Sequence, residues 1–240
     1  MKRYPLFIGV LLVFSFGCVS MPDPVNDRFL ANQTKEEEGQ IKQLEEKIVS
    51  KKIEIDGKKE NVSKAERKAT LSRSELSVLS KKRSLLVEEQ KLANLKENSS
   101  EAEIYKDKVE NIDMQMQKQK LHLNFCILSK ENEIATARVT DSELSLLVAE
   151  LNYEKAKVAE KFVEKKQKEQ GIVKKEQSFF SKIFGSSDDD GIDIAEYKSF
   201  FDNTRNKLKA DKENQYQAEI RMIQAEKEFN AYTVDEKGAK

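Results

Sequence analysis

Residues 41–76, IKQLEEKIVSKKIEIDGKKENVSKAERKATLSRSEL, decide the fold. Apolar side chains recur in this stretch at strict intervals of seven residues, at Ile41, Ile48, Ile55, Val62, Ala69 and Leu76. The position three residues later in each heptad is filled by Leu44, Ala65, Leu79, Leu86 and Ala93, and interrupted by Lys51, Lys58 and Ser72. An apolar seam held over so many heptads predicts α-helices wound into a left-handed coiled coil.

The chain outside this stretch favours helices of unusual length. The last proline is Pro24, and no glycine or proline occurs between Gly57 and Gly171. The heptad pattern stops at Asn98-Ser99-Ser100, where Ser100 is followed three residues later by Glu103, the spacing of a capping box. We therefore predict an antiparallel helical hairpin with arms over about 35–97 and 100–170, each roughly 90–105 Å long at 1.5 Å per residue. One uninterrupted rod is the alternative, because Asn and Ser are tolerated inside helices.

Two further heptad frames complete an all-α prediction. The second frame comprises Val109, Met116, Leu123, Ala137, Leu144, Leu151 and Val158, and is interrupted by Lys130. The position three residues later in the heptad is apolar at Ile112, Cys126 and Leu147. The third frame comprises Ile194, Phe201, Leu208, Met222 and Phe229, interrupted by Gln215. Asp193 and Glu196 form a capping pair before it, so we predict a C-terminal helix over about 193–233 that packs against the base of the hairpin.

Residues 177–192 separate the predicted hairpin, 35–176, from this third helix. The first part is aromatic and is expected to dock on the hairpin through Phe179, Phe180, Ile183 and Phe184. The second part, Asp188-Asp189-Asp190-Gly191, has the composition of a calcium loop, but Asp193 and Tyr197 stand where such a loop needs an apolar residue and a glutamate. We interpret it as a solvated acidic turn, and we expect residues 234–240 to be a disordered tail.

The N-terminus carries the one motif with a clear chemical meaning. Lys2 and Arg3 precede an apolar run from Leu6 to Phe14, which is too short to span a bilayer and ends at Ser15-Phe16-Gly17-Cys18. We predict a signal peptide over 1–17, lipidation of the Cys18 thiol, and a flexible tether over 18–34. An ordinary cleaved secretory signal with an incidental cysteine is the alternative.

Residues 1–18 resemble the signal peptides of bacterial lipoproteins. The usual lipoprotein box has leucine three residues before the cysteine and a small residue two before, whereas Ser15 and Phe16 stand here. Relaxed boxes of this kind are typical of spirochaetes, including leptospires, whose envelopes contain lipoproteins with long helical bodies. The resemblance implies a fatty-acyl (palmitate-type) anchor at Cys18 in the cell envelope. Val19-Ser20 lacks the aspartate that retains lipoproteins at the inner membrane of enteric bacteria, which favours the outer membrane.

The composition argues against several functions. Lysine plus arginine and aspartate plus glutamate each number 43, so no basic surface indicates nucleic acid as a partner. His122 is the sole histidine, and no catalytic, metal or phosphate-binding motif occurs. Cys126 lies in the most apolar stretch and is interpreted as a buried small hydrophobe rather than an intermolecular bridge. We predict no enzyme activity, no cofactor, no metal and no small-molecule substrate.

The leading functional hypothesis is a lipid-anchored coiled coil with a structural or interaction role in the envelope. Its expected contacts are the membrane, through Cys18, and protein partners or further copies of itself, through heptad faces. Two alternatives follow from the length of the hairpin: a periplasmic holdase chaperone, and an accessory component of an export or efflux assembly.

Overall fold

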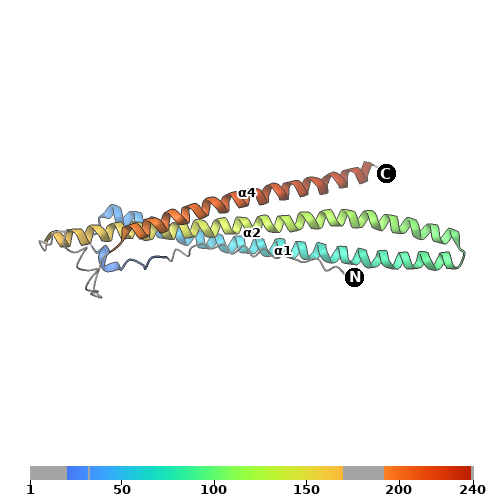
Figure 1. Cartoon of the computed structure of the whole chain (residues 1–240), viewed down its shortest axis with the longest axis horizontal. Coiled ribbons are helices and arrows are strands. Elements are labelled where there is room, and N and C mark those ends of the chain that lie inside the picture. Colours follow the sequence, from blue (N-terminus) through green and yellow to red (C-terminus); the bar gives the residue numbers. More distant parts are fainter. Residues whose placement is uncertain (1–20, 32, 170–191, 239–240) are drawn as a thin grey trace, which may run out of the picture.

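The computed structural model describes residues 21–31, 33–169 and 192–238. A short 3₁₀ helix, η1 (Asp27–Leu30), precedes three long α-helices: α1 (Lys35–Leu95), α2 (Ser99–Glu169) and α4 (Ile194–Gly238). Figure 1 shows them as an elongated bundle in which α1 and α2 run antiparallel and α4 returns beside α2. The described residues contain no strand, so the all-α prediction is confirmed.

The predicted hairpin is confirmed and the uninterrupted rod is wrong. Its arms begin and end within two residues of the predicted bounds. Salt bridges fix the antiparallel register along almost the full length, from Glu37 with Lys161 near the base to Arg83 with Asp113 near the turn. Leu86 and Ile112, which lie 13 residues before and after Ser99 in the sequence, line one cavity of about 540 Å³, as expected for the two arms of a hairpin. We call the end of the hairpin at residues 96–98 the tip and the opposite end the base.

The cap predicted at the turn lies two residues earlier than expected. Asn98, not Ser100, caps α2: its Oδ1 accepts from the Glu101 backbone N–H at 3.2 Å, and its Nδ2 donates to the Glu101 carboxylate at 3.0 Å. Asn98 also closes α1, because its N–H donates to the Ala93 carbonyl in a Schellman-type ending. A single asparagine that ends one helix and starts the next outcompetes Ser100, which lies inside the first turn of α2.

The first helix begins where the sequence supplies a cap. The hydroxyl of Thr34 accepts from the Glu37 N–H at 3.2 Å, while the Glu37 carboxylate accepts from the Thr34 N–H at 2.9 Å. This capping box and the acidic first turn stabilise the N-terminus of α1. The pKa of Glu37 is lowered, first by a hydrogen bond from Lys161 of α2 and then by the Thr34 backbone. The Glu37 carboxylate therefore does two things: it caps the start of α1, and through Lys161 it fixes the register of the hairpin.

Three of the polar residues that interrupt the predicted seams have polar partners on the facing helix. Lys51 donates to Glu143 of α2 at 3.0 Å, and Lys130 of α2 donates to Glu66 of α1 at 2.9 Å. Gln215 of α4 donates to the hydroxyl of Thr136 of α2 at 3.2 Å. Because each pair forms in one register only, these interruptions specify alignment at some cost in apolar burial.

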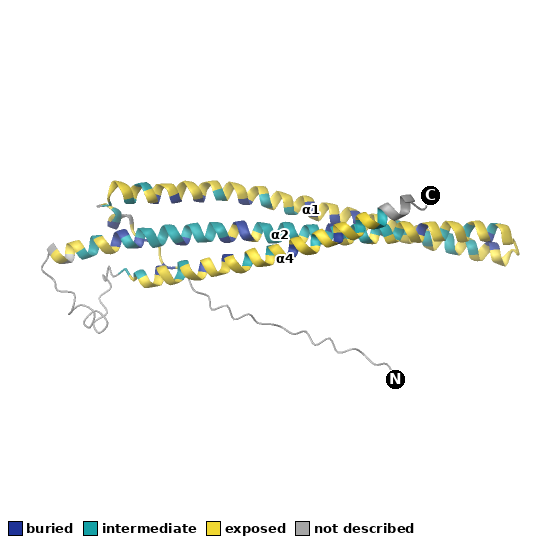
Figure 2. Ribbon diagram, turned by 90° about the horizontal axis from the view of Figure 1, so that it is seen from above, coloured by how far each residue is buried: buried dark blue, intermediate teal, exposed yellow. Residues whose placement is uncertain are grey.

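Helix α4 packs on α2 and makes no backbone contact with α1. The contact between α4 and α2 extends far beyond the base. Phe201 stacks on Tyr153 near the base, whereas the Tyr232 hydroxyl donates to the Met114 carbonyl at 3.2 Å, in the tip half of α2. We predicted that α4 contacts only the base of the hairpin, and the observed contact is much longer. Figure 2, seen from above, shows α2 between α1 and α4 and coloured largely as buried or intermediate, whereas the outer helices are mostly exposed.

Two predicted segments differ from the structure. The expected flexible tether is docked over its described part, because Val25 and Phe29 are buried at 9% and 8% exposure. The expected disordered tail is helical as far as Gly238, because residues 234–237 contain no glycine or proline and continue a helix already anchored by Tyr232. Cys18, the aromatic residues 179–184 and the acidic turn at 188–190 lie outside the described residues.

Candidate functional site

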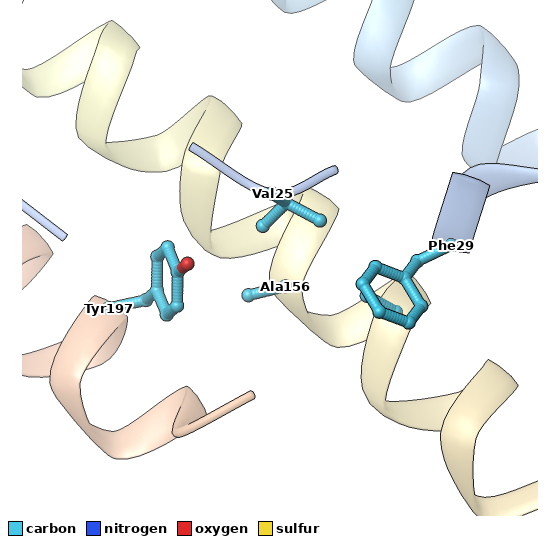
Figure 3. Close-up of a cluster of buried hydrophobic side chains, with 5 residues drawn as sticks. Val25, Phe29, Ala156 and Tyr197 are labelled. Atoms are coloured by element: carbon cyan, nitrogen blue, oxygen red, sulfur yellow. The ribbon is translucent and has the colours of Figure 1, made fainter. Parts of the chain in front are cut away.

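The base of the bundle is where the chain that follows Cys18 joins the helical body. An apolar cluster, which we call the base cluster, forms there from the N-terminal segment, α2 and the start of α4. Its buried members are Val25, Phe29, Ala156, Ala159 and Tyr197, with Tyr153, Phe162, Val163, Ile192 and Ile194 packed around them. Figure 3 shows Val25 and Phe29 approaching α2 from one segment while Tyr197 approaches it from another.

Small side chains on α2 make this docking possible. Ala156 and Ala159 are fully buried, so the incoming segments lie directly against the α2 backbone surface. The ring of Phe29 meets that of Phe162 edge to face, with centroids 6.0 Å apart. The Tyr197 hydroxyl donates to the Asp23 carbonyl at 2.6 Å, and burial raises the pKa of this phenol. The base cluster thus fixes the N-terminal segment against both α2 and α4.

A carboxylate on α2 joins all three helices. Glu143 accepts from Lys51 of α1 at 3.0 Å and forms an ion pair with Lys212 of α4 at 3.3 Å. Burial raises the pKa of Glu143, but the hydrogen bonds from the two lysines lower it by more, so its pKa lies below the ordinary value. The pKa of Lys51 is raised, mainly by its hydrogen bond to Glu54 and then by Glu143. Glu143 is therefore ionised at neutral pH and bridges two outer helices whose backbones do not pack against each other.

A second bridge is built around the sole histidine. His122 of α2 lies 3.3 Å, through Nδ1, from the hydroxyl of Ser72 of α1, while its ring packs against Phe229 of α4 with centroids 5.1 Å apart. Ser72 is 1% exposed and also accepts from Gln119 at 2.9 Å. This network explains why a serine interrupts the α1 seam. The histidine fills a structural position between three helices.

Cys126 lies beside this histidine, with Sγ 3.7 Å from Nε2. The thiol is 5% exposed, unpaired, and its pKa is raised by burial. A buried thiol with a raised pKa is a poor nucleophile, because the reactive species is the thiolate. The interpretation of Cys126 as a buried small hydrophobe is confirmed.

Neither a metal-binding cluster nor a membrane-spanning helix occurs among the described residues. No cluster of three or more His, Cys, Asp or Glu side chains is placed to hold a metal ion. None of the helices there combines the length and apolarity needed to cross a bilayer. No family model, no curated protein and no solved structure matches the chain.

The predicted heptad faces are occupied inside the chain. The seams of α1, α2 and α4 face one another, as the burial of Ile48, Ile112 and Leu208 illustrates. A protein partner must therefore use side chains outside these seams. From the sequence, we expected partners to bind these heptad faces. Three heptad frames in one chain could have indicated that the faces pack against one another instead.

Proposed function

We propose that this chain is a non-enzymatic, lipid-anchored protein of the bacterial envelope, which holds a three-helix body away from the outer membrane and presents its outer faces to protein partners or further copies. The sequence signal for the anchor is the basic start, the apolar run and the Gly17-Cys18 junction. The anchor, the outer-membrane location and the interaction role are parts of this one proposal.

The observation that carries the proposal is the place where the N-terminal segment docks. Val25 and Phe29 are buried at the base, only seven and eleven residues beyond Cys18 in the sequence. An acylated Cys18 would hold the base near the membrane and leave the tip free, about 90 Å away for the 61 residues of α1. A docked segment also transmits the orientation of the anchor to the body, which a loose tether would not do.

Acylation of Cys18 is tested by metabolic labelling with a clickable fatty acid and by detergent phase partitioning. The wild-type chain and Cys126→Ser should incorporate the label and enter the detergent phase, whereas Cys18→Ser should do neither. Cys126→Ser is the matched control because it removes the other cysteine. An unlabelled wild-type protein that stays in the aqueous phase would contradict the proposal.

A further inference from the structure

The tip half of α1 carries an apolar stripe that no part of the described chain covers. We call it the outer stripe; it comprises Leu71, Val78, Leu85 and Leu92, which are 62%, 62%, 61% and 54% exposed. Their spacing of seven residues, close to two helical turns, places all four on one face. The residues that follow each of them, such as Ser72 and Ala93, are the ones that face α2.

The outer stripe is confined to the tip half. Single exposed apolar residues are common on protein surfaces, but four in strict heptad spacing are typical of a helix-packing face. The same heptad position nearer the base holds Gln43, Ser50, Gly57 and Lys64. Beside the stripe lie Thr70, Ser77 and Ser84, whose small side chains permit a second helix to approach closely.

The charges along the stripe identify its partner. One flank carries Lys68, Glu75, Lys82 and Glu89, again seven residues apart and alternating in sign. An identical helix running in the opposite direction places Lys68 against Glu89 and Glu75 against Lys82, so all four charges on this flank meet an opposite charge. On the other flank Arg67 and Glu88 are related in the same way, and Lys81 faces the uncharged Ser74. The surface is complementary to itself when reversed.

The length of the stripe selects this antiparallel arrangement. A two-fold axis at Val78 overlaps residues 61–95 of the two helices, which is the tip half and little else. A parallel pairing would bring the base halves together as well, with Gly57 and Lys64 where the stripe has leucine and valine. The opposed pairing therefore covers the outer stripe and leaves in solvent the base half of α1, whose equivalent heptad positions are polar or glycine.

We propose that the tip half of α1 binds a second copy of this chain, antiparallel and centred on Val78. The pairing would join two bodies tip to tip, with their bases at opposite ends. This names the partner for the interaction role in the proposed function, but it does not require the lipid anchor, so the two can fail separately. Only four apolar side chains of each helix take part, so we expect a weak, reversible dimer.

The test uses the full chain with Cys18→Ser and Cys126→Ser, purified in a mild non-ionic detergent, so that introduced cysteines are the only thiols. Val78→Cys should form a disulfide-linked dimer with itself. Leu71→Cys should cross-link with Leu85→Cys in a mixture, but not with itself. Ser50→Cys, at the equivalent heptad position in the base half, is the matched control and should stay monomeric. Cross-linking of Leu71→Cys to itself, or no cross-linking above the Ser50→Cys level, would overturn the proposal.

Charge reversal provides a second readout on the same background without introduced thiols. Lys82→Glu should weaken dimerisation at least about tenfold in sedimentation equilibrium, because two like-charged contacts replace two attractive ones. The exchange Glu75→Lys with Lys82→Glu should restore it. Circular dichroism should give the same helix content for all three proteins, because Glu75 and Lys82 are exposed and Glu75→Lys removes only one surface hydrogen bond, from Gln119 of α2. Equal association of the single and double variants, or a chain that remains monomeric at high concentration, would contradict the pairing.

Discussion

Glu97 is the non-glycine residue at which the described backbone takes a positive φ, 57°. It occupies the position after the end of α1 where left-handed backbone closes the helix, and where glycine is usual because it has no Cβ. The hairpin turn thus carries local strain, which for an L-residue costs roughly 1–2 kcal/mol.

Replacing Glu97 by glycine should therefore stabilise the protein. We expect Glu97→Gly to raise the free energy of unfolding by about 0.5–1 kcal/mol, since relief of the strain exceeds the added flexibility of the unfolded chain. Lys96→Gly is the control: Lys96 has φ −86°, so glycine brings no relief and should destabilise. Urea denaturation measures both, and a loss of stability in Glu97→Gly would contradict the assigned turn.

Glu143 makes the stability of the bundle depend on pH. Its pKa in the folded chain lies below the ordinary carboxyl value of 4.5, because hydrogen bonds from Lys51 and Lys212 outweigh the effect of burial. A lowered folded pKa means that the stabilisation is fully present above pH 4.5 and is lost as the pH falls through the folded value. We expect Glu143→Gln to cost about 1 kcal/mol at pH 7 and progressively less below pH 4.5.

Denaturation of wild type and Glu143→Gln between pH 3 and pH 8 measures this difference. Glu219→Gln is the control, because Glu219 is exposed on α4 and takes part in none of the ion pairs described above. It should change stability little at any pH. A pH-independent cost for Glu143→Gln would show that shape, not charge, holds the three helices at this point.

The bounds of α1 and α2 lie within two residues of the predicted ones, but the cap at the turn is Asn98 and not the predicted Ser100, and the partners of the helices were not predictable. Thr34, Asn98 and Asp193 act on backbone groups within a few residues, so short stretches of sequence contain the whole cause of each helix start. The path of α4 depends on which face of the hairpin offers a matching groove. The heptads of α4 predict that it packs against another helix. That this helix is α2, and that the contact extends to Met114, depends on how all three helices fit together.

The docked N-terminal segment shows a second limit of sequence reasoning. Val25 and Phe29 lie in a stretch that is rich in proline and asparagine and has no helical periodicity, so nothing in that stretch indicates burial. Their binding surface is created by Ala156 and Ala159 on a helix more than a hundred residues away. Only the folded hairpin brings the two together.

Truncation of Phe29 should release this segment without unfolding the hairpin. We expect Phe29→Ala to cost about 2–3 kcal/mol of local stability, below the 3–5 kcal/mol of a fully enclosed phenylalanine because the base cluster lies at the end of the bundle. Hydrogen exchange should accelerate in η1 and in the first turns of α4, with residues 60–130 unchanged. Met21→Ala is the control, since Met21 is 52% exposed. Uniform acceleration along all helices would contradict a separate base cluster.

The molecule as a whole is a row of three helices with α2 in the middle, not a closed bundle. The backbones of the outer helices pack against that of α2 but not against each other, and polar side chains such as Glu143 and His122 reach both. This arrangement exposes more helix surface than a closed bundle of the same length. It suits a protein whose role is to present faces at a distance from its attachment point.

The central claim, that α1 folds back along α2, is tested most directly by one distance between spin labels. Lys59 of α1 and Arg138 of α2 are exposed and line the same cavity of about 350 Å³. Both are labelled through cysteines on the full chain with Cys18→Ser and Cys126→Ser, diluted with unlabelled protein to suppress signals between copies. Packed helices lie about 8–10 Å apart, so pulsed dipolar spectroscopy should give a narrow distribution below about 30 Å once the labels are included. A separation near 120 Å, the value for about 80 residues of continuous helix at 1.5 Å each, would contradict the hairpin and everything built on it.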